Sequence, residues 1–259
     1  LNIKNIFSQI NTFMYEYKSI FISDLHLGTP GCSSIELSDF LKNNSCERLY
    51  LVGDIIDCWQ LSKRMYWPQE HSNVIRRILT MAKRGTKVYW IVGNHDEMLR
   101  NWLDLELQFG RIRILNEYVH HGVNGKRYLV THGDMFDPLM YSGKFLMYFG
   151  DFLYNWLMKL NRWISFVRRK LGLSYWSFSA YCKSQTKEAI NIISNYKEQI
   201  VKHCKKQGYD GIICGHIHSH MIETIQNIEY MNDGDWVESR TALIEHTNGK
   251  WELRTYDGE

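Results

Sequence analysis

Proline, paired cysteines and long uncharged apolar runs are all scarce in this sequence of 259 residues. It holds only three prolines and no low-complexity tract, which argues against a disordered chain. Its six cysteines form no Cys-x-x-Cys pair, so we expect reduced, structural thiols and a cytoplasmic location. The most apolar long stretch, 145–167, is interrupted by Asp151, Lys159 and Arg162, and no transmembrane helix is predicted.

The first residues also lack the apolar core and small-residue cleavage site of a signal peptide. Met14 lies just before the first expected strand. We therefore expect residues 1–13 to be dispensable for folding and activity.

Charge is unevenly distributed along the chain. Segment 139–206 carries twelve Lys or Arg and three acids, a net charge of +9, whereas the whole chain is only +3. The same segment holds 14 of the 36 aromatic residues and looks mostly helical. We interpret it as a helical cap, residues 139–206, inserted into an acidic core formed by residues 14–138 and 207–259.

Three stretches rich in β-branched and aromatic residues each end directly on a polar motif. The pairs of stretch and motif are 17–23 with Asp24-Leu25-His26, 48–52 with Gly53-Asp54, and 87–92 with Gly93-Asn94. Helical patterns over 33–43 and 70–84 separate them, and a further helix is expected near 96–109. This alternation predicts an α/β fold in which ligands gather beyond the carboxyl ends of parallel strands.

The second half of the sequence is richer in strand patterns. Strands over 117–122 and 126–131 should form a hairpin that delivers His132, and a strand over 210–214 should deliver His216. Four later stretches look like a β-meander, namely 221–225, 228–231, 236–246 and 250–256.

Five short motifs together supply ligands for two divalent ions, although each alone is a weak signal. They are Asp24-Leu25-His26, Gly53-Asp54-Ile55-Ile56-Asp57, Gly93-Asn94-His95-Asp96, Thr131-His132-Gly133-Asp134 and Gly215-His216-Ile217-His218. The expected ligands of the first ion are Asp24, His26, Asp54 and His218. Those of the second ion are Asp54, Asn94, His132 and His216. The mixed nitrogen and oxygen set suits Mn, Fe, Zn or Co better than Ca, and we expect manganese.

The motifs also suggest a role for each residue in displacement at phosphorus by activated water. Asp54 is the expected bridge, because a carboxylate has two oxygens and can bind two cations at once. Asp24 and His26 would point the same way if the strand were still extended there. His95 is the expected catalytic partner of Asp54, stabilising or protonating the leaving oxygen. Asp57 and Asp96 are candidates for orienting histidines.

The five motifs, in this order, resemble those of the calcineurin-like metallophosphoesterase superfamily. That resemblance implies a four-layer αββα sandwich and the ligand roles given above. Within the superfamily the chain looks most similar to the UDP-2,3-diacylglucosamine pyrophosphohydrolase group. The features shared with that group and its relatives are the run Ser23-Asp24-Leu25-His26-Leu27-Gly28, the run from Asp54 to Trp59, the 84-residue spacing from His132 to His216, and the run from Asn232 to Ser239.

The narrower resemblance implies cleavage of a UDP-linked diacyl sugar to UMP and a lipid monosaccharide phosphate, a step of lipid A synthesis. It implies a peripheral location on the cytoplasmic face of the inner membrane. His95 departs from the group, because the best-studied members carry Arg at that position. Histidine there is the pattern of the wider superfamily, which is compatible with a sister branch.

The segment 139–206 leaves two interpretations open. Its apolar residues at helical spacing, such as Phe145, Phe149 and Trp156, are typical either of ordinary packing or of an acyl-chain pocket or membrane-facing surface. The cluster Arg168-Arg169-Lys170 is either a solvated face or a site for anionic headgroups. The candidate substrate contacts are Asn94, His95, Ser179, Lys183, Lys187 and His216.

Two alternative functions also follow from the residues. One is a phosphodiesterase, phosphatase or nuclease acting on a soluble nucleotide or nucleic acid, since a basic segment also suits phosphate backbones. We disfavour nucleic acid as the partner. The other is a lipid-binding module with an inactive site, against which the complete ligand set argues.

Overall fold

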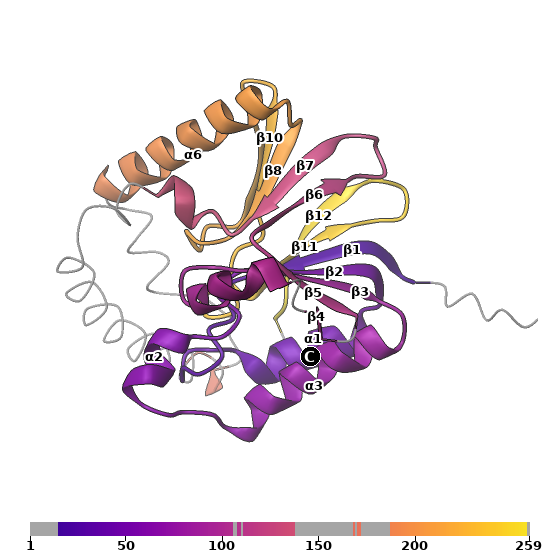
Figure 1. Ribbon diagram of the computed structural model, residues 1–259, viewed down its shortest axis with the longest axis vertical. Helices are drawn as coiled ribbons and strands as arrows, with labels where there is room; N and C mark the ends of the chain where they lie inside the picture. Colours follow the sequence, from indigo (N-terminus) through magenta and orange to yellow (C-terminus); the bar gives the residue numbers. More distant parts are fainter. Residues whose placement is uncertain are drawn as a thin grey trace, which may run out of the picture.

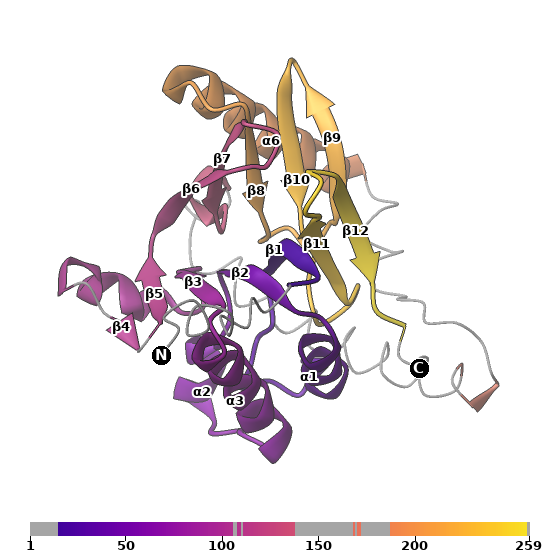
Figure 2. The same ribbon diagram turned by 90° about the vertical axis from the view of Figure 1, so that its right-hand side faces the viewer.

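The computed structural model describes residues 15–105, 108–109, 111–137, 168, 170–171 and 187–257. Within these residues two mixed β-sheets lie face to face, and helices cover their outer faces (Figure 1). The same layering is visible after a quarter turn (Figure 2). The predicted four-layer α/β/β/α sandwich is therefore confirmed.

The first sheet has seven strands and contains the three strands that end on the first three motifs. In sheet order they are β12 (Trp251–Thr255), β11 (Thr241–Glu245), β1 (Tyr17–Ile22), β2 (Cys46–Val52), β3 (Lys87–Ile91), β5 (Ile112–Leu115) and β4 (Gln108–Phe109). Strands β1, β2, β3 and β5 run parallel, so their carboxyl ends meet at one edge. Strand β11 pairs antiparallel with β1 and carries β12 outside it.

The second sheet has five strands. In sheet order they are β6 (Glu117–His121), β7 (Arg127–Thr131), β8 (Gly211–Cys214), β10 (Ile228–Asn232) and β9 (Met221–Ile225). Strands β7, β8 and β10 are parallel, with the antiparallel strands β6 and β9 at the edges. The motifs containing His132 and His216 follow β7 and β8, so they too leave the sheet at a common edge.

Two groups of helices cover the sandwich. The described helices are α1 (Ser34–Asn43), α2 (Cys58–Lys63), α3 (Gln69–Lys83), α6 (Lys187–Gln207) and the 3₁₀ segments η3 (Glu97–Leu105) and η4 (Asp134–Phe136). Helices α1 and α3 bury residues such as Leu37 and Val74 against the first sheet. Helix α6 buries Tyr196, Ile200 and Cys204 against the second sheet. The part of segment 139–206 from residue 196 onward thus packs on the core, and most of the rest lies outside the described residues.

A third apolar cluster fills the space between the two sheets. Its aromatic members stack: the ring centroids of Phe21 and Tyr50 are 4.5 Å apart, and those of Tyr50 and Tyr89 are 4.8 Å apart. Such aromatic pairs contribute about 0.5–1.5 kcal/mol beyond the area they bury. The tyrosine- and phenylalanine-rich strands of the sequence therefore form the seam of the sandwich.

A cluster of buried polar side chains lies between the two sheets. His120 Nε2 lies 2.9 Å from Glu245 Oε2, and its Nδ1 lies 3.0 Å from the hydroxyl of Tyr50. Glu245 also accepts hydrogen bonds from the Ser19 hydroxyl and the Val123 amide, both at 2.8 Å. Because every polar atom of the carboxylate is satisfied, this group links β1, β6 and β11 in one register.

Glu245→Gln should lower the free energy of unfolding at about pH 7 by about 1–3 kcal/mol, the usual cost of disrupting buried hydrogen bonds. Burial alone would raise the pKa of Glu245, but the neighbouring His120 and the donors Val123 N–H and Ser19 outweigh it, and the pKa lies below the ordinary 4.5. A carboxyl group with a lowered pKa stabilises the fold fully above its unfolded pKa and loses that contribution as the pH falls through the folded pKa.

Urea unfolding of wild type and Glu245→Gln, measured from about pH 7 down to about pH 3, tests this effect. The difference in unfolding free energy should be largest at neutral pH and shrink in acid. A difference that stays constant down to about pH 3 would contradict the assignment.

Three local expectations differ from the structure. The pattern near 96–109 gives η3 and β4 instead of one helix, and the pattern over 236–246 gives a strand only at Thr241–Glu245. The expected meander is also divided, because β9 and β10 belong to the second sheet and β11 and β12 to the first.

Two further sequence expectations can be compared with the described residues. The five cysteines among them are free thiols, as expected, and Cys182 lies outside them. In this part of the chain, no helix combines the length and apolar content needed to cross a bilayer.

Candidate metal centre

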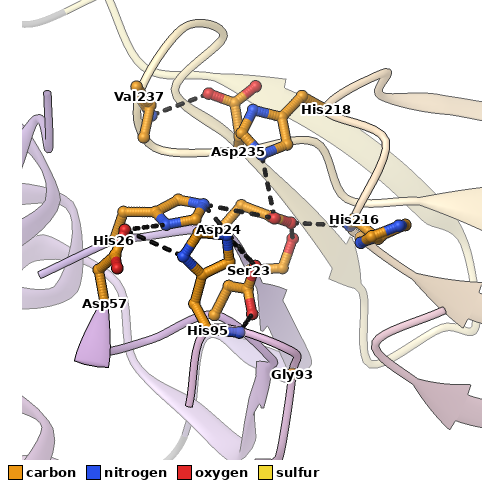
Figure 3. A network of polar contacts seen from close by, with 12 residues as sticks. Ser23, Asp24, His26, Asp57, Gly93, His95, His216, His218, Asp235 and Val237 are labelled. Carbon is orange, nitrogen blue, oxygen red and sulfur yellow. Dashed lines mark hydrogen bonds and ion pairs between the residues drawn. The ribbon is translucent and has the colours of Figure 1, made fainter. Parts of the chain in front are cut away.

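The five motifs converge at the edge of the sandwich where the parallel strands end. Asp24 follows β1, Asp54 follows β2 and Asn94 follows β3, while His132 and His216 follow β7 and β8 of the other sheet. Figure 3 shows His218 and Asp24 pointing toward each other, with His26 and His95 on the same side. The site is thus assembled from both sheets.

The backbone of this site is left-handed at several non-glycine residues. The φ angles of Asp24, His26, Asp54, His216 and His218 are 51°, 48°, 53°, 69° and 51°. The expectation that Asp24 and His26 share an extended strand is therefore wrong, because β1 ends at Ile22. Each such residue costs energy that the surrounding fold must offset, and strain of this kind concentrates at functional sites.

Glycines in the motifs permit close contact between neighbouring loops. A Cβ atom on Gly93 would lie 2.2 Å from Asp54 Oδ1, and one on Gly53 would lie 2.3 Å from the ring of His132. No side chain fits at such distances. The glycine that precedes Asp54 and the one that precedes Asn94 therefore each make room for a side chain from another motif.

One group of side chains surrounds Asp24. Its Oδ1 lies 3.1 Å from His218 Nε2 and 3.8 Å from His26 Nε2. The same His26 nitrogen lies 3.8 Å from Asp54 Oδ2. The four residues expected to hold the first ion are thus neighbours.

A second group surrounds Asp54. Its Oδ2 lies 3.3 Å from His132 Nε2, while His132 Nδ1 lies 2.9 Å from the carbonyl oxygen of Val52. That contact fixes Nδ1 as the protonated nitrogen and leaves Nε2 facing Asp54 as a potential ligand. Asp54 Oδ1 accepts a hydrogen bond from the His95 amide at 2.8 Å, so the carboxylate is held from both sides.

Two expected ligands of the second ion differ in their surroundings. The Oδ1 atom of Asn94 is buried and has no hydrogen-bond partner among the described residues, as expected for an oxygen reserved for a cation. His216 instead directs Nε2 to Asp137 Oδ2 at 3.0 Å, although its ring lies 5.1 Å from that of His132. Asp137 was not anticipated, because it belongs to none of the five motifs.

These residues fit a pair of divalent ions. Three trios each bring one ligand atom per residue within 4.8 Å of one another, and they are Asp24 with His26 and His218, His26 with Asp54 and His95, and Asp24 with Asp54 and His132. Asp24 and Asp54 are each shared between two trios, so each carboxylate lies within reach of both groups of ligands. The buried, unsatisfied Asn94 oxygen adds a neutral donor beside them. Imidazole and carboxylate donors together favour transition metals such as Mn, Fe or Zn.

Mutual attraction keeps the ligands in their charged forms. Burial alone would raise the pKa of Asp54, but His132, His95 and His26 outweigh it and hold that pKa well below its usual range. Burial alone would lower the pKa of His132, yet Asp54 and Asp24 hold it well above its usual range. A cation that binds here replaces the imidazole proton, so we expect metal affinity to fall as the pH falls.

Asp57 positions two histidines, as the sequence suggested. Its Oδ2 lies 3.2 Å from His26 Nδ1 and 3.0 Å from His95 Nδ1. Its Oδ1 accepts a hydrogen bond from the Gln60 amide and caps α2. The His95 ring also packs on Trp59, with ring centroids 4.4 Å apart. His95 is therefore fixed beside the cluster by two neighbours.

Asp96 has a different role from the one expected. It accepts hydrogen bonds from the amides of Ile55 and Gly93 and from the indole of Trp90. It holds the loops that follow β2 and β3 together, and the contacts described for it include no histidine.

The remaining predicted contacts belong to segment 139–206. Ser179 and Lys183 lie outside the described residues. Lys187 is the first residue of α6. All three stay predictions.

Comparisons with known proteins identify the family of this chain. A UDP-2,3-diacylglucosamine hydrolase of Aliivibrio fischeri is 25% identical over 250 residues, covering 90% of this chain and 96% of the relative. One from Histophilus somni (strain 129Pt) is 28% identical over 250 residues, covering 90% and 97%. A solved archaeal phosphodiesterase is 13% identical, covers 92% of this chain and 98% of its own, and has a TM-score of 0.43. The family model for calcineurin-like phosphoesterases matches residues 17–220, and the chain belongs to that family.

Proposed function

We propose that the chain hydrolyses the pyrophosphate bond of UDP-2,3-diacylglucosamine, giving UMP and 2,3-diacylglucosamine 1-phosphate. The convergence of Asp24, Asp54 and His132 with the buried Asn94 oxygen carries the reaction class. The choice of substrate is supported by curated relatives of that name that align over 90% of this chain. One water molecule is consumed, and the oxygen that bridges the two phosphorus atoms leaves with one product.

The residues of the site have distinct tasks in this reaction. Asp24, His26, Asp54 and His218 would hold one ion, and Asp54, Asn94, His132 and His216 the other. Two divalent ions held there, most simply Mn²⁺, would activate a water molecule and neutralise charge on the phosphoryl oxygens. Asp57 orients the two histidines that flank Asp54. His95, which is not needed as a ligand, is placed to stabilise the leaving oxygen.

His95→Ala should slow turnover by about a hundredfold or more, the usual contribution of a general acid. Metal content, measured by atomic emission on purified protein, should remain near that of wild type. His95 Nε2 also lies 3.9 Å from Asp54 Oδ2, within one of the potential ligand trios. Loss of bound metal in the variant would therefore assign His95 as a ligand and overturn its role in leaving-group stabilisation.

A Mn²⁺-supplemented assay with three substrates tests the proposed function. We expect rapid hydrolysis of UDP-2,3-diacylglucosamine, slow hydrolysis of bis-p-nitrophenyl phosphate, and no strongly salt-dependent cleavage of DNA or RNA. Preference for the soluble diester or for nucleic acid would replace the lipid substrate. Absence of all three activities in metal-loaded protein would favour a binding module.

The proposed substrate also sets the expected location. A diacylated sugar nucleotide resides in a bilayer, so the chain would act as a peripheral protein on the cytoplasmic face of the inner membrane. The basic residues of segment 139–206 support this, because each Lys or Arg near an anionic surface contributes about 1 kcal/mol. Sedimentation with anionic but not neutral vesicles would be the expected behaviour.

A further inference from the structure

The segment between β10 and β11 passes from the second sheet to the first and lies against the backbone of Asp24. Strand β10 ends at Asn232 in the second sheet, and β11 begins at Thr241 in the first. Within the crossover, the amide of Trp236 donates to the carbonyl oxygen of Asp24 at 3.2 Å. The Nδ2 of Asn232 donates to the carbonyl oxygen of Gly215 at 2.7 Å. The crossover therefore supports two loops of the metal centre at once.

The hydroxyl of Ser23 connects this crossover to Asp24. Its oxygen lies 2.6 Å from Asp24 Oδ2, 2.7 Å from Asp233 Oδ1 and 3.0 Å from the carbonyl oxygen of Gly234. All three neighbours are acceptors when the carboxyls are ionised, but a serine hydroxyl carries a single proton. Two contacts this short to carboxyl oxygens require a second proton, which one of the carboxyl groups must supply.

Asp233 is the group that carries this proton. Asp24 is surrounded by donors, since its Oδ2 also accepts a hydrogen bond from the His216 amide at 2.9 Å, and His218 faces its Oδ1. Asp233 is fully buried, and its Oδ2 has no hydrogen-bond partner among the described residues. Burial of a carboxyl group favours its neutral form over its ionised form. Burial accordingly raises the pKa of Asp233 well above its usual range.

We infer that Asp233 is a positioning residue for the metal ligand Asp24, acting as a neutral donor through the hydroxyl of Ser23. The Asp233 carboxyl donates to Ser23 Oγ, and the Ser23 hydroxyl donates to Asp24 Oδ2. Two donors, Ser23 and the His216 amide, then hold Oδ2. The carboxylate cannot rotate, and Oδ1 remains directed at the cluster. The inference rests on the proposed metal-dependent function.

A pair of substitutions separates this role from packing. Asp233→Asn keeps the shape and replaces the donating O–H by an N–H, so Mn²⁺ affinity measured by calorimetry should stay within about threefold of wild type. Asp233→Ala removes the donor, and the affinity should fall about 10- to 100-fold, as for other groups that orient metal ligands. Ser23→Ala should have a similar effect. The double variant Ser23→Ala with Asp233→Ala should bind Mn²⁺ no more weakly than the single variant that has the lower affinity. Both residues act through one chain of hydrogen bonds.

The outcomes that would overturn the inference are equally defined. Equal loss of affinity in Asp233→Asn and Asp233→Ala would mean that the residue acts as an anion. Unchanged affinity in Asp233→Ala would reduce it to packing. Glu245→Gln, a buried carboxyl remote from the cluster, controls for stability, since it should lower the melting temperature without changing Mn²⁺ affinity. Because metal binding is measured without substrate, these results remain decisive even if the proposed substrate is wrong.

Discussion

Asp54→Asn should reduce turnover by about a thousandfold or more, because metal-ion stabilisation is worth several kcal/mol and each 1.36 kcal/mol is a factor of ten. Asp54, like Asp24, belongs to two of the three potential ligand trios, and it is the only carboxylate in the trio with His26 and His95. The amide in the variant has nearly the same shape and still offers an acceptor to the His95 amide. Its neutral oxygen is a poor bridge between two cations. Turnover under saturating Mn²⁺ is the measurement.

The matched control is Asp39→Asn, which removes the same charge from an exposed position on α1. It should behave like wild type. Thermal unfolding with and without Mn²⁺ provides a readout independent of substrate, because a ligand that binds only the folded state raises its stability. We expect Mn²⁺ to stabilise the control and to stabilise Asp54→Asn much less. Near-normal turnover of Asp54→Asn would refute the bridging assignment.

Gly93→Ala is the second substitution with a very large expected effect. The added methyl group would lie 2.2 Å from Asp54 Oδ1 and 2.5 Å from the Asp54 amide nitrogen. Backbone cannot yield easily, so the Asp54 side chain must move away from the cluster. Misplacement of a reacting group by about 1 Å can cost about a hundredfold in rate, and here the displaced group is the proposed bridge. We expect activity to be lost together with high-affinity metal binding.

Gly125→Ala is its control. Gly125 has a φ of +80° in the turn between β6 and β7, and nothing lies within 4 Å of an added Cβ. Its substitution should cost about 1–2 kcal/mol of stability from backbone strain. Activity should be retained. If the two variants lose activity in proportion to stability alone, the close contact between Gly93 and Asp54 is not the cause.

The sequence predicts the strand ends of this site well. A buried parallel strand must be apolar over its whole length, so the first polar residues after it mark the edge where ligands gather. This is why Asp24, Asp54 and Asn94 could be predicted to lie at one edge of a sheet from their positions after the expected strands. The helices α1 and α3 were also predictable, because their apolar residues recur at helical spacing.

Other features were hidden because they depend on hydrogen bonds between distant residues. Residues 236–240 look like part of a strand, but the carboxylate of Asp235 accepts hydrogen bonds from the amides of Val237, Glu238 and Ser239 and folds them into a turn. Helix α2 is only six residues long, too short for a periodic pattern. The left-handed backbone of Asp24 and His26 likewise leaves no compositional signal.

The role of Asp137 could not be predicted for a similar reason. It reaches His216 across 79 positions of the chain, at 3.0 Å. Sequence spacing gives no measure of such a contact, because it depends on how η4 leaves the second sheet. Ser23 and Asp233, which are 210 positions apart, are a second example.

The origin of the ligands has a mechanical consequence. Asp24 and Asp54 extend from the first sheet, whereas His132 and His218 extend from loops of the second. Two metal ions bound among these side chains would therefore cross-link the two sheets of the sandwich. Separating the sheets would require breaking metal–ligand bonds as well as the aromatic seam. Metal loading and resistance to unfolding would thus be coupled, and the proposed catalytic centre would also hold the two sheets together.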